Sequence, residues 1–271
     1  MTRIIGRSRF ATLVRLCLEE VLYYKAAFLI NLCTPFILLG GQFLLWRALF
    51  NMSETGVIGV YTRAEMYTFL LVAFAINNLL TWSSENALSR EIRSGTVAAR
   101  FIRPVPFIVQ SLAGMMGYMI PQFILNFTIV GVVFVAFGSH LVMPSAGTLG
   151  LALVSLTLGL ALRMAMISCI SLICFFTTSH LGLTWTRSAI TEFFSGAIIP
   201  VTLFPAWLAA ISFHTPFPLI LQVPISIFLG EPTHFPLGFT FALQIGWTLV
   251  FLALHQALYA KVRRNVSFAG G

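Results

Sequence analysis

The sequence predicts an all-α integral membrane protein with six transmembrane helices, an interfacial helix before the first span and a re-entrant outer hairpin before the last. Hydrophobic residues make up 58% of the 271 positions and charged residues only 9%, whereas soluble proteins carry about 25% charged residues. The apolar residues gather in six long runs, and the charges gather between them. This number of charged residues is too small to cover the surface of a soluble globule. The surplus apolar surface is therefore expected to face lipid.

Each predicted span is a mostly apolar run close to the ~20 residues that a helix needs to cross a bilayer. Strands of a membrane barrel would instead alternate apolar and polar residues over ~10 positions. Residues 26–271 are therefore expected to form a single transmembrane domain. Its predicted spans are 26–45, 66–82, 112–137, 149–176, 188–204 and 237–258.

The distribution of Lys and Arg predicts the orientation. With the N-terminus inside, only Arg47 and Arg63 fall outside and Arg163 falls within the fourth span. By the positive-inside rule, both termini are predicted to be cytoplasmic. The basic residues on the inner side are Arg3, Arg7, Arg9, Arg15, Lys25, Arg90, Arg93, Arg100, Arg103, Arg187, Lys261, Arg263 and Arg264.

The N-terminal segment 1–25 precedes the first span and is amphipathic. Between residues 3 and 24, apolar side chains at roughly helical spacing alternate with charges such as Arg7, Arg15 and Glu19. This pattern favours a cytoplasmic helix lying along the inner leaflet. An ordinary basic tail that only sets topology is the alternative.

The segment 205–235 is apolar but too broken to cross the membrane. It holds one charge, Glu231, and seven of the 12 prolines of the chain lie between Pro200 and Pro236. Because proline removes a helix donor and clashes with the preceding turn, short broken helices are expected. Irregular backbone at membrane depth must be buried in protein or line a wet cavity, which predicts a re-entrant outer hairpin. A plain surface loop would expose too much apolar area.

Residues that several function classes require are missing. The chain has no Asp, which excludes Ser-His-Asp triads and aspartyl dyads, and it has no GxxxxGK[ST] phosphate loop. Its four cysteines and five histidines do not form metal-ligand spacings. The net charge of +8 follows from the basic loops rather than from a nucleic-acid-binding surface. We therefore expect no enzyme activity, metal site, cofactor or nucleic-acid partner.

Two charges of opposite sign fall within neighbouring predicted spans, Arg163 in the fourth and Glu192 in the fifth. Charges at mid-depth cost at least ~2.5 kcal/mol and normally face a partner or the interior of the bundle. We expect an interhelical pair between them. It is either a structural link between the two helices or a contact for substrate or gating.

The predicted inner loop 83–107 has more structure than topology alone requires. Residues 85–93 extend the second span, and Ser94-Gly95 then breaks the helix, with the glycine suited to a left-handed backbone. Two further turns over 96–103 end before Pro104. This pattern is typical of a short cationic helix that docks a partner, whereas a solvated basic loop would need neither the glycine nor the prolines.

Together these features resemble the membrane permease of ATP-binding-cassette (ABC) exporters of the type-two (ABC-2-like) branch. The resemblance covers nearly the whole chain, although an arginine in the fourth span is not part of the general family pattern. It rests on the basic helix at 3–24, EIRSGTVAARFIRP at 91–104, SGAIIPVTLFPAWL at 195–208 with its continuation to Gly230, and the tail YAKVRRNVSFAGG.

The resemblance implies a role for two of these elements. The loop after the second span would be the coupling helix that enters a groove on the ATPase, and the hairpin before the sixth would form the outer gate. The matching coupling positions are Glu91, Arg93, Gly95, Arg100, Arg103 and Pro104. Those of the gate are Pro200, Pro205, Pro216, Pro218 and Pro224.

The resemblance further implies a permease subunit in the bacterial inner (plasma) membrane, which exports an amphipathic or lipid-like substrate. Its partners would be a separate ABC ATPase that carries ATP and Mg, a second permease, identical or paralogous, and membrane lipids. An ATP-independent secondary transporter or channel is the alternative. An inverted repeat would favour it, and none is seen between residues 1–137 and 138–271.

Overall fold

The computed structural model describes residues 11–16, 19, 25–79, 91, 94–177 and 180–265. Helices dominate this part of the chain, which contains one two-stranded hairpin. The elements are α2 Lys25–Met52, β1 Val57–Ile58, β2 Tyr61–Thr62, α3 Arg63–Asn77, α5 Ala98–Ile102, α6 Phe107–Phe137, the 3₁₀ helix η1 Gly138–His140, α7 Ala146–Ile173, α8 His180–Phe194, the 3₁₀ helix η2 Val201–Leu203, α9 Ala206–Phe213, α10 Gln222–Leu229 and α11 Leu237–Asn265.

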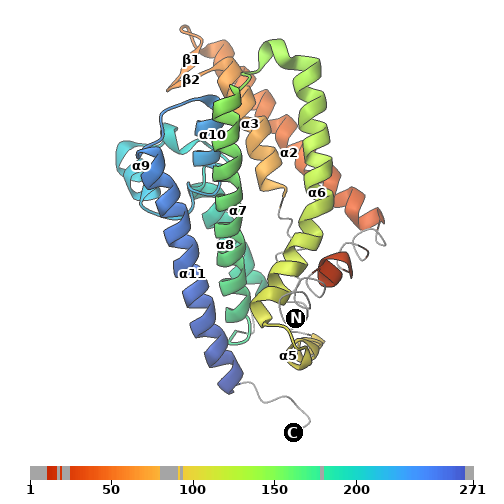
Figure 1. Ribbon diagram of the computed structural model, residues 1–271. Coiled ribbons are helices and arrows are strands. Elements are labelled where there is room, and N and C mark those ends of the chain that lie inside the picture. Colours follow the sequence, from red (N-terminus) through yellow and green to blue (C-terminus); the bar gives the residue numbers. More distant parts are fainter. Residues whose placement is uncertain are drawn as a thin grey trace.

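The long helices give the molecule two distinct ends (Figure 1). The β1–β2 hairpin, α9 and the connection between α6 and α7 lie at one end, which we call the hairpin end. Short helix α5, the start of α6 and the end of α11 lie at the other, which we call the α5 end. The two predicted functional elements, the inner loop and the proline-rich segment, are therefore at opposite ends.

The predicted class of all-α membrane protein is confirmed by the helical content and by the apolar length of three helices. Within the described residues, Phe107–His140, Ala146–Ile173 and Leu237–Arg264 are long and apolar enough to cross a membrane. The predicted spans 26–45 and 66–82 overlap α2 and α3.

The predicted fifth span, 188–204, is wrong in its boundaries. Helix α8 runs from His180 to Phe194, because Gly196 follows with φ +89° and Pro200 begins the next turn. Arg187 therefore lies inside the helix, where it is buried and donates to the Ser188 hydroxyl, rather than in a basic loop. The predicted span began too late because Arg187 was expected in the basic loop before it.

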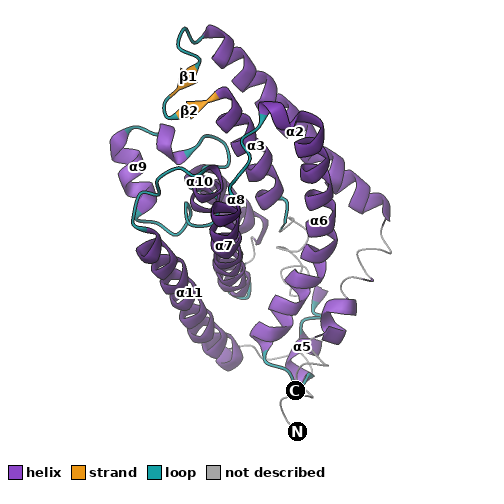
Figure 2. Ribbon diagram, turned by 45° about the horizontal axis from the view of Figure 1, so that its top comes forward, coloured by secondary structure: helices purple, strands orange, loops and turns teal. Residues whose placement is uncertain are grey.

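Helix α7 occupies the middle of the bundle, with α11 on one side and α6 on the other (Figure 2). Gly159 allows the chain before α10 to approach α7, since a Cβ there would lie 3.0 Å from the Leu219 carbonyl oxygen. The buried amide of Gln244 on α11 donates to the Ser155 carbonyl and hydroxyl at 3.0 Å and to the Leu219 carbonyl at 2.8 Å. One side chain thus joins α11, α7 and the approach to α10, as interhelical polar contacts do in membranes.

Most of the predicted interfacial helix at 3–24 lies outside the described residues. Residues 11–16 are helical, and Arg15 forms an ion pair with Glu19 at 2.8 Å. Residues 85–90 and Arg93 of the predicted inner loop also lie outside the described part.

Candidate functional site: the α5 segment and the opposite hairpin end

The backbone reverses at Gly95 between Glu91 and α5. The positive φ predicted for this glycine is confirmed at +74°, and no atom lies within 4 Å of the place where a Cβ would be. The Val97 N–H and the Ser94 hydroxyl both donate to the Glu91 carbonyl at 3.2 Å. The turn therefore depends on the backbone freedom of glycine rather than on space for its side chain.

Glu91 and Arg100, both predicted to be coupling residues, contact each other. Arg100 on α5 donates from Nε and Nη2 to the two carboxylate oxygens of Glu91 at 2.5 and 2.7 Å, and only 12% of the Arg100 side chain is exposed. The same guanidinium lies 5.9 Å from the centroid of the Phe107 ring. Gln110 on α6 donates to the carbonyls of Arg100 and Val105 at 2.9 and 2.8 Å. The forked pair fixes the orientation of Arg100 relative to Glu91, and the contacts of Gln110 and Phe107 hold α5 against the start of α6.

Phe101 connects α5 to three other helical segments. Its ring centroid lies 5.5 Å from that of Phe107 at the start of α6, 6.3 Å from Phe175 just after α7, and 6.1 Å from Tyr259 on α11. Val97, Leu172 and other apolar residues complete the cluster. Phe101 therefore packs α5 against the start of α6, the residues just after α7, and α11 at one point.

The opposite face of α5 is exposed. Ala99 and Ile102 share this face at helical spacing, exposed Arg103 follows directly after α5, and Ile102 is 85% exposed. Pro104 follows them and is also exposed. Ile102 was missed by the sequence analysis, because a single apolar residue among arginines gives no periodic signal.

A comparison with family models shows which proteins this chain resembles. The model described as ABC-2 family transporter protein matches residues 36–270, which include α5, the long helices and the proline-rich segment. The chain belongs to the ABC-2 transporter family. No curated protein matches it with significant similarity. Membership of this family supports the assignment of the chain as a membrane permease of an ABC transporter.

At the hairpin end of the ABC-2 permease, the proline-rich segment forms two short helices, α9 and α10, as the prolines predict. The five gate prolines of the sequence analysis mark its turns. Pro200 precedes η2, Pro205 precedes α9, Pro216 and Pro218 are buried in the connection between α9 and α10, and Pro224 lies inside α10.

A buried polar network links the β1–β2 hairpin to α10 and η2. The Tyr61 hydroxyl accepts hydrogen bonds from Thr202 Oγ1 at 3.0 Å and from Gln222 Nε2 at 3.1 Å. Gln222 also donates to Ser226 Oγ at 3.2 Å, and its Oε1 accepts from the Val201 N–H at 3.0 Å. Tyr61 and Gln222 are 0% and 1% exposed. None of these residues was singled out from the sequence, where isolated uncharged polar residues carry no positional signal.

Glu231, in the connection between α10 and α11, lies next to this network. Burial, the larger cause, and the negative charge of Glu65 together raise the pKa of its carboxyl group to about 7, against the opposing effect of a hydrogen bond with Tyr61. Burial likewise raises the pKa of Tyr61 to about 12. The permease therefore carries at this end a carboxyl group that changes charge near neutral pH.

Arg163 and Glu192, the predicted intramembrane pair, lie on α7 and α8. Arg163 is buried on α7, and its Nη1 donates to Asn77 Oδ1 at 3.1 Å and to the Asn77 carbonyl at 3.4 Å. Glu192 lies on an exposed part of α8. The C-terminal end of α3 thus provides two contacts of Arg163, and its pairing with Glu192 stays a prediction.

Proposed function

We propose that this permease forms one half of the membrane domain of an ATP-driven exporter in the bacterial inner membrane. It pairs with a second permease, identical or paralogous, and each half binds a separate ABC ATPase that holds ATP and Mg. Six spans cross the membrane, both termini are cytoplasmic, and α9 and α10 form the re-entrant outer hairpin. The substrate is amphipathic or lipid-like, in keeping with the scarcity of charge in the chain.

The observation that carries the proposal is that one face of α5 is packed against the bundle and the other is exposed. Its inner face is fixed by the Glu91–Arg100 pair and by Phe101, whereas its outer face presents Ile102 and Arg103. A helix held in this way suits a partner that pushes on it. Closure of the ATPases around ATP displaces α5, and the Phe101 cluster passes the displacement to α6, α7 and α11.

In this mechanism the chain itself hydrolyses no ATP. Its contribution is mechanical, with an apolar contact at Ile102, a positive charge at Arg103 for acidic or carbonyl groups of the ATPase, and a rigid connection behind them. Of the predicted coupling residues, Arg103 joins Ile102 as a docking residue on the outer face, whereas Glu91 and Arg100 are positioning residues on the inner face.

The test is co-purification of the permease with the proposed ABC ATPase partner, followed by ATP hydrolysis of the complex. Ile102→Asp and Arg103→Glu are expected to insert normally but to lose at least half of the bound ATPase. Arg264→Glu reverses an exposed charge at the same end, on α11, and serves as the matched control. Equal retention of the ATPase by all three variants would mean that α5 is not the docking element.

The alternative of an ATP-independent transporter has its own outcome. Purified permease that hydrolyses ATP without a partner would contradict the proposed division of labour. Substrate movement that continues in proteoliposomes lacking the ATPase would instead favour a secondary transporter or channel.

A further inference from the structure

The β1–β2 hairpin lies against the proline-rich segment at two points. At the turn of the hairpin, a Cβ on Gly59 would overlap the Leu203 side chain, so the turn is in close contact with η2. Farther along, the Tyr61 hydroxyl accepts hydrogen bonds from Thr202 on η2 and Gln222 on α10, and its own proton is shared with Glu231. One phenol therefore joins the hairpin to η2, to α10 and to the connection that leads to α11.

The end of the hairpin is fixed by Glu65, in the first turn of α3. The Glu65 carboxylate accepts from the Thr62 N–H at 2.7 Å and from the Thr62 hydroxyl at 2.8 Å, and the Glu65 N–H donates back to that hydroxyl at 3.4 Å. This reciprocal cap ties β2 to α3. The same carboxylate is near enough to Glu231 for the two negative charges to repel each other. The hairpin in its observed position thus holds a second carboxylate near Glu231.

The Glu231 carboxyl group lacks the partners that an ionised group needs. Its Oε1 is buried and has no hydrogen-bond partner in the part of the chain that the structure describes. The ion pairs formed there include neither Glu231 nor Glu65. A buried charge without a partner is strongly unfavourable, whereas a protonated carboxyl group costs much less. The raised pKa of Glu231, about 7, agrees with this geometry.

Two other side chains that carry or can gain a positive charge near this contact are engaged elsewhere. Arg63 on α3 donates to Asn51 Oδ1 at 3.0 Å, at the end of α2. His234 lines a pocket together with Glu231, but its exposed ring stacks on Phe213 of α9 with 4.3 Å between the ring centroids. The side chains that reach Tyr61 from η2 and α10 are uncharged. Ionisation of Glu231 is therefore opposed by burial and by Glu65 for as long as the hairpin keeps this position.

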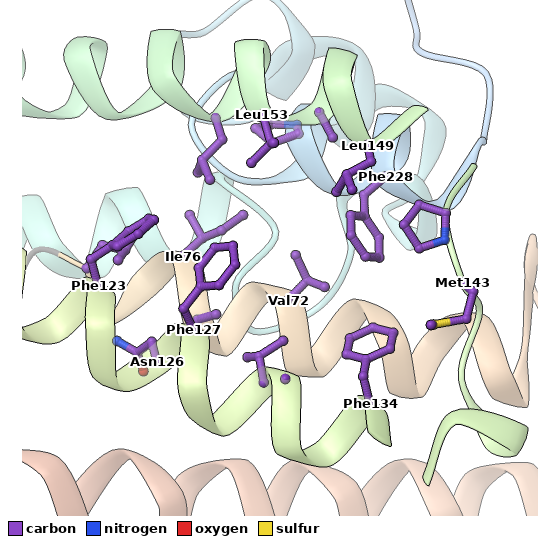
Figure 3. A pocket seen from close by; sticks show the side chains of 18 residues that line it. Val72, Ile76, Phe123, Asn126, Phe127, Phe134, Met143, Leu149, Leu153 and Phe228 are labelled. Atoms are coloured by element: carbon purple, nitrogen blue, oxygen red, sulfur yellow. The ribbon is translucent and has the colours of Figure 1, made fainter. Parts of the chain in front are cut away.

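The interface between α3 and α10 is only partly filled, which leaves room for a second arrangement. A cavity of about 290 Å³ lies between α3, α6, α7 and α10, and Val72 from α3 and Phe228 from α10 both line its open centre (Figure 3). Atoms that border an unfilled space lack dispersion contacts on that side. Movement of α3 and the hairpin away from α10 therefore gives up fewer contacts than it would in a filled core.

We propose that the β1–β2 hairpin is a pH-dependent strap over the proline-rich segment, closed while Glu231 is protonated and opened when Glu231 ionises. Opening lets the Glu231 carboxylate reach water and moves it away from Glu65. It also breaks the hydrogen bonds that Tyr61 forms with η2 and α10. The pH of the outer solution then regulates how firmly the outer hairpin is held.

The regulatory meaning of the strap rests on the proposed function, in which this end of the permease is the outer gate. The strap itself is built from one permease chain, and its movement can be followed in purified permease without ATPase or transport. Failure of α5 to bind the ATPase and failure of the hairpin to respond to pH are therefore separate results.

The test is amide hydrogen exchange of the permease in nanodiscs between pH 5 and 8. The exchange rate divided by the intrinsic rate at each pH reports the open fraction. The amides to follow are those of the hairpin and that of Val201, which donates to Gln222 Oε1 at 3.0 Å. If the Glu231 carboxyl has its ordinary pKa of 4.5 in the open form, the open fraction should rise roughly ten- to a hundred-fold over this range. Amides in the middle of α7 are the reference and should show no such rise.

Four substitutions assign the response to its residue. Glu231→Gln keeps the shape of the side chain but does not ionise, and it should abolish the rise. Glu65→Gln keeps the cap on β2 and removes the second charge, so the rise should be smaller than in the parent. Glu54→Gln removes an exposed carboxyl just before the hairpin and is the matched control, and His234→Gln removes the other titratable group of the pocket. Both should keep the full rise.

Unchanged exchange in α7 verifies that each variant is folded. A rise that is absent from the parent would overturn the proposal. The same holds for a rise that persists in both Glu231→Gln and Glu65→Gln, or one that is lost in His234→Gln instead.

Discussion

The ion pair between Glu91 and Arg100 offers a sharp test of how α5 works. If Arg100 acted mainly on the ATPase, its replacement would leave the isolated permease unchanged. The structure places its guanidinium against Glu91, with 12% of the Arg100 side chain and 33% of the Glu91 side chain exposed. We therefore expect Arg100→Met to destabilise the permease even in the absence of the ATPase.

The magnitude follows from this partial burial. Exposed ion pairs contribute about 0.2–1 kcal/mol, and removal of one partner from a fully buried pair costs about 3–5 kcal/mol. Arg100→Met also loses a long contact to the Ser111 hydroxyl at 3.4 Å and the position over Phe107. An intermediate loss of about 2 kcal/mol is expected for Arg100→Met and about 1 kcal/mol for Glu91→Gln, since glutamine retains one acceptor.

The assay is a double-mutant cycle on the free energy of unfolding in mixed micelles, without ATPase. The double variant should lose about 1 kcal/mol less than the sum of the two single variants, because the second substitution no longer breaks an intact pair. Losses that add within about 0.3 kcal/mol would show that Glu91 and Arg100 do not stabilise the permease as a pair. Arg100 would then be assigned to the surface that docks the ATPase. Arg103→Glu, on the exposed face, should leave the same free energy nearly unchanged.

Three further outcomes are expected. Gly196→Ala should lower the free energy of unfolding by about 2–4 kcal/mol, since its φ is +89° and the new Cβ would lie 2.7 Å from Gln222 Oε1; Gly56→Ala, with φ +68° and open space, should lose only the ~1–2 kcal/mol of backbone strain. The melting temperature of Glu231→Gln relative to that of the parent should rise between about pH 4.5 and 7. In this range the folded parent carboxyl, with its raised pKa, binds more protons than the unfolded one, so the parent loses stability as the pH rises. Equal melting temperatures throughout that range would contradict the burial of Glu231. In a background without native cysteines, a cysteine at position 103 should be labelled only from the cytoplasm and one at position 57 only from outside; the reverse would invert the predicted topology.

The sequence predicted the helices better than their ends and their partners. Long apolar runs are strong signals, and each of the six predicted spans overlaps a helix. The boundary of the fifth span was wrong because Arg187 was expected in a solvent-exposed loop. In a single sequence, a buried arginine within a helix such as α8 looks the same as an exposed arginine in a loop. Gly95 was predicted correctly, since serine-glycine before a short helix and a proline has few other backbone solutions.

Side-chain partners were harder to predict than backbone. The contacts of Arg163 with Asn77 gave no signal in the sequence, because they depend on how α3 packs against α7. The same holds for the buried amide of Gln222. Its meaning comes from neighbours that are far away in the sequence, so only the fold reveals it.

The fold joins the α5 end to the hairpin end through a continuous series of packed contacts. Phe101 stacks on Tyr259 of α11, and farther along the same helix Gln244 bonds to α7 and to the Leu219 carbonyl, directly before α10. Gln222, at the start of α10, then holds Tyr61 of the hairpin. Packed contacts couple the two ends of the molecule only where one of the contacting groups has two arrangements. The last contact has the chemistry for two arrangements, because burial and the charge of Glu65 raise the pKa of Glu231, which lies beside Tyr61, to about 7.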